Sequence, residues 1–265
     1  MPINLGSGAI SGAYVGSTAV SAAYLGSTSV FSAGGFTPED VAGLEAWIDA
    51  SDATTVTLSG STVTAVTDKA GNSHSFTPSG GTGPTLTAAS QNSLDVFTFA
   101  DSSKKLVTAT TIPVGSASTT FVVASRDANS SNGYGRILSG SDTGDGYSPA
   151  ILSGYAVTGS NDDFEYYGGG SGPNLSAGVN NTSGPKLITI SHTDGGTINL
   201  YYGGTLADTS SSAKTFGTDG WNEISGGSIS EGATFTFCEL IVYDSALSSA
   251  DRESVESYLN TKWGL

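Results

Sequence analysis

The chain has 265 residues and a formal net charge of −15, with nine Lys and Arg in total, and charged residues make up 12 % of it. Nucleic acids and anionic membranes both attract basic surfaces, so this composition argues against either as a partner. The length suits one β-sandwich with a small additional element. Because charged residues are about half as frequent as usual, Ser, Thr, Asn and Gly must supply much of the solvated surface.

A repeat with a period of ten residues occupies positions 3–31. Residues 5–10 align with 15–20 and 25–30, and each unit places a Gly-Ser or Gly-Ser-like turn between two short apolar runs. The pattern predicts two short strands and a tight turn in every unit. So few apolar residues cannot form a core of their own, so we expect the segment to pack either against the sandwich or against another chain, and we favour another chain. A flexible Gly/Ser-rich leader is the alternative, although a linker needs no regular period.

The segments GAYVGSTAVS and AAYLGSTSVF resemble the short LGS-containing repeats at the N-termini of phage tail-fibre and other virion structural proteins. The resemblance implies that residues 1–33 form an arm for attachment to other virion proteins and for oligomerisation, with a homotrimer as the expected state. The candidate contact residues of this arm are its larger side chains: Leu5, Ile10, Tyr14, Val15, Val20, Tyr24, Leu25 and Val30.

Residues 34–265 are predicted to form one all-β domain. Thr37 caps a single helical turn with Pro38 at its first position. Short apolar runs separated by turn residues then predict a two-sheet antiparallel sandwich, and Asp194-Gly195-Gly196 predicts a tight hairpin. The predicted strands before the closing one are 44–49, 56–58, 63–67, 95–99, 105–107, 119–125, 136–139, 150–153, 155–158, 164–167, 186–193, 197–202 and 223–224.

The closing segment, residues 234–265, predicts a strand followed by a helix. Strict alternation divides the apolar side chains of the strand between two faces: Phe235, Phe237, Ile241 and Tyr243 on one, and Cys238, Leu240 and Val242 on the other. A strand that is apolar on both faces must be covered on both. The expected cover is the helix, capped by Ser248 or Ser249 and ended by Gly264. Cys238 is the one cysteine, so we expect a buried, unpaired thiol.

The sequence from residue 239 to the end, ELIVYDSALSSADRESVESYLNTKWGL, resembles the closing strand and helix of laminin-G-like (concanavalin-A-like) jelly-roll domains. Other matching segments occur in the expected order: GLEAWIDASD, VTDKAGNSHSF, TTFVVASRD, LITISHTDGGTINLYYGG and EISGG. The resemblance spans residues 38–265 and implies a jelly-roll sandwich with a C-terminal helix. This family is defined by its fold, so a function has to be argued from a site.

Catalysis is one hypothesis, because some glycan hydrolases and lyases share this fold. Retaining β-glucanases of this architecture carry an E-x-D-x-E strand, which the sequence lacks. Asp163 and Glu165 are the nearest pair of acids with one residue between them, but Asn161 and Tyr167 stand at the next alternating positions where a third acid would be needed, and no G-x-S-x-G elbow occurs. The two histidines, His74 and His192, fall in or beside predicted strands. We therefore predict that the protein is not an enzyme.

Calcium is a candidate ligand because many laminin-G-like domains bind it at the loop rim. The candidate ligands lie in two turn-rich segments: Asp142, Asp145, Asp162 and Asp163. Neither spacing follows a known calcium-loop motif. The alternative is that these are solvated acids selected by turn geometry, and no cofactor is required.

Glycan binding is the commonest function in the family that the sequence resembles. Sugars bind flat aromatic faces and polar hydrogen-bonding groups, and loops on a rigid sandwich commonly carry such sites. The candidate rings lie in Gly-, Asn-, Asp- and Ser-rich segments: Tyr134, Tyr147, Tyr155, Tyr166, Tyr167 and Trp221. The alternative is that several of these rings belong to the core.

Together these features predict a non-enzymatic bacteriophage virion protein, either a tail-fibre or tail-tip component or a head decoration. Its sandwich would contact host-surface glycans. The sequence shows no secretory signal pattern, so we expect synthesis in the host cytoplasm and a final place on the virion surface. The alternatives are a carbohydrate-binding or adhesive domain of a bacterial cell and, less favoured, a polysaccharide-degrading enzyme.

Overall fold

The computed structural model describes four short strands between residues 13 and 32, together with residues 35–101, 103–114, 117–126, 135–140, 149–153, 164–168, 174–178, 184–193, 195–211, 220–225 and 234–265. The chain divides into two compact units, Met1–Thr37 and Pro38–Leu265. The sequence places this boundary between residues 33 and 34.

The described part of the first unit consists of two antiparallel hairpins. β1 (Ala13–Val15) pairs with β2 (Thr18–Val20), and β3 (Ala22–Leu25) pairs with β4 (Thr28–Ser32). The strands predicted for the second and third repeats are therefore confirmed. The first repeat, residues 5–10, lies outside the described residues.

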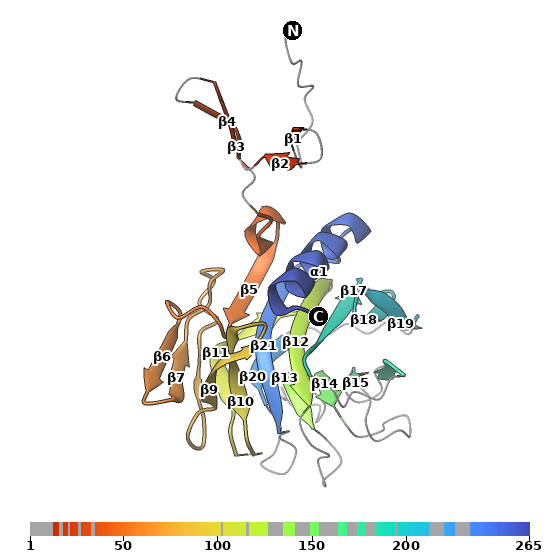
Figure 1. Ribbon diagram of the computed structural model, residues 1–265. Helices are drawn as coiled ribbons and strands as arrows, with labels where there is room; N and C mark the ends of the chain where they lie inside the picture. Colours follow the sequence, from red (N-terminus) through yellow and green to blue (C-terminus); the bar gives the residue numbers. More distant parts are fainter. Residues whose placement is uncertain are drawn as a thin grey trace. The chain divides into compact units, whose positions relative to one another are not determined.

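One sheet of the second unit is built around its closing strand, β21 (Phe235–Tyr243), whose first half pairs with β10 and whose second half pairs with β5. On its other side the sheet continues through β12, β17, β18 and β19. We call this the helix-covered sheet (Figure 1). Its other strands are β5 (Leu44–Asp49), β9 (Thr85–Gln91), β10 (Leu94–Phe99), β12 (Ser118–Arg126), β17 (Lys186–His192), β18 (Ile198–Tyr202) and β19 (Thr205–Ser210).

The other sheet, which we call the second sheet, has the order β8-β11-β20-β13-β14-β15-β16, and its pairs are antiparallel. The hairpin of β6 (Val56–Ser59) and β7 (Thr62–Val66) joins the sheets, because β7 pairs with both β8 and β9. The strands of the second sheet are β8 (Phe76–Pro78), β11 (Leu106–Pro113), β13 (Arg136–Gly140), β14 (Ala150–Ser153), β15 (Phe164–Tyr167), β16 (Asn174–Ser176) and β20 (Gly220–Ile224).

The hydrophobic core takes residues from both sheets. In the helix-covered sheet, the rings of Phe99 and Phe235 stack at 4.5 Å between centroids on neighbouring strands. Trp221 of β20 belongs to the same core, and its Nε1 donates a hydrogen bond to Thr120 Oγ1 of β12 (2.8 Å). The indole therefore ties the second sheet to the helix-covered sheet and leaves its polar atom paired, as a buried tryptophan requires.

The closing strand does not alternate as predicted. Phe235, Phe237, Leu240 and Val242 all belong to the core between the sheets. The pairing of β12 with β21 jumps from Val123 opposite Glu239 to Ala124 opposite Phe237. A β-bulge at Cys238 therefore reverses the alternation halfway along the strand, a change of phase that strict period-two alternation does not include.

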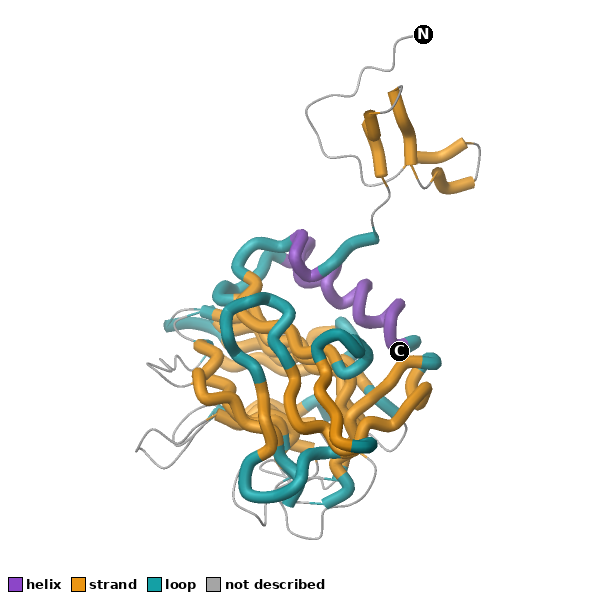
Figure 2. The backbone as a smooth tube through the Cα atoms, turned by 90° about the vertical axis from the view of Figure 1, so that its left-hand side faces the viewer, coloured by secondary structure: helices purple, strands orange, loops and turns teal. Residues whose placement is uncertain are grey.

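The helix follows the sequence prediction closely. α1 (Ser249–Trp263) begins after Ser248, whose Oγ accepts a hydrogen bond from Asp251 N, and it ends at Gly264, which has φ 65°. Its buried side chains include Val255, Leu259 and Trp263. Figure 2 shows the helix lying along one side of the stranded body. Within the described part of the chain, no helix combines the length and the apolar character needed to cross a membrane.

Most of the strands expected from the sequence are confirmed within one or two residues, except β11, which runs to Pro113, and β20, which starts at Gly220. The short helical turn is present as a 3₁₀ turn at Pro38–Asp40, and Cys238 is buried and forms no disulfide. β8, β9, β16 and β19 were not predicted, because their polar residues show no apolar alternation. The predicted strand 155–158 lies outside the described residues.

Candidate functional site

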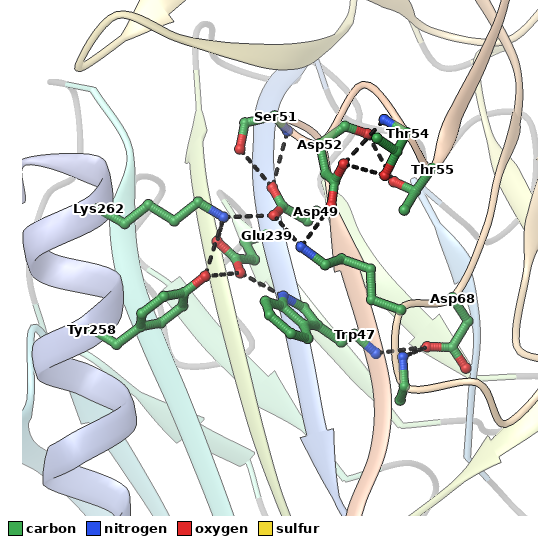
Figure 3. Close-up of polar contacts among 12 residues, drawn as sticks. Trp47, Asp49, Ser51, Asp52, Thr54, Thr55, Asp68, Glu239, Tyr258 and Lys262 are labelled. Atoms are coloured by element: carbon green, nitrogen blue, oxygen red, sulfur yellow. Dashed lines mark hydrogen bonds and ion pairs between the residues drawn. The ribbon is translucent and has the colours of Figure 1, made fainter. Parts of the chain in front are cut away.

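A buried carboxylate beneath α1 collects four hydrogen bonds, and Figure 3 shows it beside Trp47, Tyr258 and Lys262. Glu239 of β21 is 1 % exposed, and its Oε1 accepts from Trp47 Nε1 (2.6 Å) and Tyr258 Oη (3.2 Å). Its Oε2 accepts from Lys262 Nζ (2.8 Å) and Trp263 Nε1 (2.6 Å). Three of these donors lie on α1 and the fourth on β5, so one side chain fixes the helix to the sheet.

Asp49 extends this network toward the loop after β5. Its Oδ2 pairs with Lys262 Nζ (2.7 Å) and Lys69 Nζ (3.1 Å), and Lys69 also pairs with Asp52 (2.8 Å). The ammonium group of Lys69 lies 3.9 Å from the centroid of the Trp47 ring. We call this cluster the clasp; its members are Trp47, Asp49, Asp52, Lys69, Glu239, Tyr258, Lys262 and Trp263.

The two buried acids of the clasp respond to opposing effects. Burial and the charge of Asp49 raise the pKa of Glu239 above its ordinary value, against the opposing influence of Lys262 and Trp47. Burial alone would also raise the pKa of Asp49, but Lys262 and Ser51 hold it below its ordinary value. Both carboxylates are covered and saturated with donors. The clasp is therefore a structural element, not a site for a ligand.

The second sheet has its own outer face, opposite the core. One row of residues that pair across the strands of this sheet lies in the core: Leu106, Ile224, Leu138, Ile151, Tyr166 and Leu175. The next row must then face outward, because successive side chains alternate. Its members are Val107, Glu223, Ser139, Ala150, Tyr167 and Asn174. We call this row, with Asn222, Lys105, Arg136 and Glu165, the outer face.

A bulge in β20 places two polar side chains together on this face. In the pairing of β20 with β13, Glu223 lies opposite Ser139 and Trp221 lies opposite Gly140. Asn222, between them, has no opposite residue on β13 and is therefore the extra residue of the bulge in β20. Trp221 and Ile224 both belong to the core, which leaves Asn222 and Glu223 on the outer side. Bulges of this kind frequently re-aim side chains beside functional sites.

The polar groups of the outer face are unevenly satisfied. Lys105 Nζ pairs with Glu223 Oε1 (3.1 Å), and Ser139 Oγ approaches Glu223 Oε2 (3.4 Å). Asn222 Oδ1 is buried and has no hydrogen-bond partner among the described residues. Such orphaned acceptors are rare in folded proteins, so a donor beyond the described residues is expected here.

The exposure of the outer face varies along its row. Ser139 and Ala150, in the middle, have no exposed surface, and Glu165 of the neighbouring row is 1 % exposed. Tyr167, Asn222 and Glu223 are partly exposed. A ligand would therefore meet an aromatic ring at one end of the row and an amide–carboxylate pair at the other.

The structure corrects two of the predicted glycan-binding rings. Trp221 and Tyr166 are 1 % and 2 % exposed and lie in the core, so neither ring presents a face to a ligand. Burial raises the pKa of Tyr166 far above its ordinary value. Tyr167 stands one position further along β15 and therefore points outward, partly exposed. The remaining candidates lie outside the described residues: Tyr134, Tyr147 and Tyr155.

The predicted calcium ligands also lie outside the described residues: Asp142, Asp145, Asp162 and Asp163. Within the described ranges, no group of three or more His, Cys, Asp or Glu side chains is placed to hold a metal ion. In the first unit, six of the predicted contact residues belong to strands: Tyr14, Val15, Val20, Tyr24, Leu25 and Val30. Leu5 and Ile10 lie outside the described residues.

Asn222, Glu223 and the clasp are not predicted as functional or structural sites by the sequence pattern. The segment EISGG marked the end of β20, but nothing in it signals that Asn222 is an extra residue in the pairing. Glu239 appeared as the one charged residue in an apolar strand, which in retrospect was a usable signal, because a buried charge requires nearby partners.

No protein-family model matches the sequence, and no curated protein matches it. Solved structures share its fold. The binding domain of Paraclostridial Mosquitocidal Protein 1 has a TM-score of 0.58 and 14 % identity, over 84 % of this chain and 54 % of that chain. The sialidase of Trypanosoma rangeli in complex with sialic acid has a TM-score of 0.59 and 12 % identity, over 84 % of this chain and 33 % of that chain.

A third similar structure is domain 4 of AbnA, a GH43 extracellular arabinanase from Geobacillus stearothermophilus, in complex with arabinotriose. It has a TM-score of 0.57 and 12 % identity, over 78 % of this chain and 95 % of that chain. The present chain thus spans about half of the toxin chain and a third of the sialidase chain. At these identities the likeness establishes the fold alone, a β-sandwich.

Removing the charge of Glu239 tests the clasp. Glu239→Gln turns an amide NH₂ toward donors that need an acceptor, so we expect the free energy of unfolding to fall by about 3 kcal/mol in urea titrations. The control is Glu253→Gln, whose side chain is 66 % exposed, and it should change stability by less than about 0.5 kcal/mol. Equal effects of the two substitutions would contradict a structural role for Glu239.

Acid should weaken the Asp52–Lys69 pair. Hydrogen bonds from Lys69 and Thr54 lower the pKa of Asp52 from 3.8 to about 2. The ionised form is therefore favoured in the folded state, and its contribution is complete above pH 3.8 and disappears as the pH falls through about 2. In Asp52→Asn, the loss of unfolding free energy between pH 3.8 and about 2 should be smaller than in the wild type by about 1 kcal/mol. Glu39→Gln, an exposed acid outside the clasp, should leave the pH profile unchanged.

Proposed function

We propose that this chain is a non-enzymatic virion structural protein whose β-sandwich binds host-surface glycans through the outer face of the second sheet. We further propose that the sandwich is a jelly roll of the laminin-G-like kind. Support for this comes from the two antiparallel sheets, the capping helix and the order of the matching segments. The solved neighbours include a toxin binding domain and a domain in complex with arabinotriose.

The observation that carries the glycan proposal is the contrast between the two sheets. α1 covers the outer side of one sheet and locks its polar groups into the clasp. The outer face of the second sheet combines a partly exposed tyrosine with a carboxylate and an amide oxygen that has no partner among the described residues. Aromatic faces and convergent polar groups are what hydroxyl-rich ligands need.

The first unit supports the attachment part of the proposal. Its described hairpins have strands of three to five residues, and isolated two-stranded hairpins of this size are marginal in water. Packing against other virion proteins, or against two more copies in a homotrimer, would supply the missing contacts. The proposed location is the virion surface, in a tail fibre, a tail tip or a head decoration.

Two alternatives remain in competition. A carbohydrate-binding or adhesive domain of a bacterial cell would use the same outer face without the arm-mediated assembly. A polysaccharide-degrading enzyme is favoured only by the sialidase likeness, which covers 33 % of that chain. The buried acids of the clasp are engaged with donors, which supports the non-enzymatic proposal. Calcium at Asp142, Asp145, Asp162 and Asp163 stays a prediction.

Polysaccharide binding tests the sandwich. The full chain should retain host-surface polysaccharides in a pull-down or calorimetric titration without releasing reducing sugar. Tyr167→Ala should weaken binding several-fold because it removes the aromatic face. Leu206→Ala, at an exposed leucine of the other sheet, is the matched control and should bind normally. Release of reducing sugar would instead support the enzyme, and absence of binding would exclude glycan recognition.

Deletion of residues 1–33 tests the arm. If the arm assembles the protein, the shortened chain should be a monomer in light scattering and should fail to enter particles in a complementation assay. The sandwich should keep its melting temperature, because the second unit has its own core. A shortened chain with unchanged oligomeric state and particle incorporation would contradict the virion proposal.

A further inference from the structure

The ammonium group of Lys262 lies between two buried carboxylates of the clasp. Its Nζ is 2.7 Å from Asp49 Oδ2 and 2.8 Å from Glu239 Oε2 (Figure 3). Asp49 and Glu239 are 3 % and 1 % exposed, so water has little access to either carboxylate. Taking an ammonium group and two carboxylates out of water is costly, because their mutual attraction repays only part of the lost hydration. A reaction that removes two of these charges would recover much of this cost.

A lysine amine and an aspartate carboxyl group form a neutral amide when they condense with loss of one water. In the clasp the two groups already touch, and well-oriented intramolecular reactions reach effective molarities of about 10⁵–10⁸ M. The carbon under attack, Asp49 Cγ, is bonded to the oxygen that Lys262 contacts. A covered site also hinders the return of water, which would hydrolyse the product.

The loop after β5 prepares Asp49 as the electrophile. Its second oxygen, Oδ1, accepts hydrogen bonds from Ser51 N (3.0 Å) and Ser51 Oγ (2.7 Å). Two donors on one oxygen fix the carboxyl group and stabilise the negative charge that this oxygen acquires when the nitrogen adds to Cγ. The oxygen that leaves is therefore Oδ2, which faces Lys262.

Glu239 is placed to move the protons. Lys262 attacks only after its ammonium group has lost a proton, and Glu239 Oε2 is in direct hydrogen-bond contact with it. Burial and the charge of Asp49 raise the pKa of Glu239, which favours uptake of this proton. Hydrogen bonds from the indoles of Trp47 and Trp263 hold the carboxyl group in position. Nucleophile, electrophile and proton carrier thus lie in one buried cluster.

We propose that Lys262 Nζ and Asp49 Cγ condense spontaneously to an intramolecular amide bond, with Glu239 as the catalytic proton carrier. The Nζ–Cγ bond forms and the Cγ–Oδ2 bond breaks. Glu239 takes two protons from the nitrogen, one after the other, and delivers them to Oδ2, which leaves as water. The nitrogen keeps its third hydrogen, and the charges of Lys262 and Asp49 cancel. The bond joins β5 to α1 across 213 positions of the chain, and it does not depend on the proposed glycan binding.

Mass spectrometry of the denatured full chain tests the proposal. Apart from any removal of Met1, the wild-type protein should be lighter than its sequence by one water. A protease digest should contain a branched peptide that joins the segments around Asp49 and Lys262. Lys262→Arg and Glu239→Gln should each restore the full sequence mass and abolish the branched peptide, and circular dichroism shows whether each variant is folded.

Lys69 provides the matched control. Its Nζ also contacts Asp49 Oδ2 (3.1 Å), but its other partner is Asp52, and among the described residues it has no contact with Glu239. Lys69→Arg should therefore keep both the loss of water and the branched peptide at Lys262.

Contrary results would overturn separate parts of the proposal. A wild-type chain of full sequence mass would exclude the bond and leave the clasp as a cluster of ion pairs. Loss of water without a branched peptide would mark cyclisation at an aspartate and would exclude the bond equally. A branched peptide at Lys69 would overturn Lys262 as the nucleophile, and a bond that persists in folded Glu239→Gln would overturn the role of Glu239.

Discussion

The structure depends on the burial of one carboxylate, Glu239, at the centre of the helix-covered sheet. A lone buried charge is costly, and this one is made tolerable by two indoles, a phenol and an ammonium group that converge on it. Three of these donors lie in the last two turns of α1, so the helix cannot leave the sheet without abandoning the charge. The same contact covers the outer side of β21, which is why this strand tolerates apolar residues on both of its faces.

Covering one sheet has a consequence for the other. α1 contributes to the clasp on the first sheet, whereas on the outer face of the second sheet Lys105 pairs with Glu223 and the described residues leave Asn222 Oδ1 without a partner. Bulges on β13 and β20 disturb regular pairing at this place. The clasp is thus saturated with hydrogen bonds, whereas the outer face of the second sheet holds a buried acceptor that the described residues leave unpaired. The proposed glycan function uses this asymmetry.

Local chemistry made much of the fold predictable. Ser248 and Gly264 delimit α1 because a side-chain oxygen satisfies its first amides and a left-handed residue ends it. β12, β17 and β18 were found because their apolar residues repeat with the strand period and a Gly-rich turn separates the last two. The strands β9 and β19, which are rich in Thr, Ala and Ser, carry no such signal, and their neighbours alone hold them in the sheet.

The sequence by itself determined the all-β class, the repeat of the first unit, the capped helix and the need to cover the closing strand, since each follows from residues close together in the chain. Tertiary structure alone decided the bulges at Cys238 and Asn222, and with them which side chains face the core. In the folded sheets, Tyr166 and Trp221 face the core and Tyr167 faces outward. The fold also places Trp47 within hydrogen-bond distance of Glu239, 192 residues further along the chain. A bulge is a mismatch between two strands that are distant in sequence, so neither strand encodes it alone.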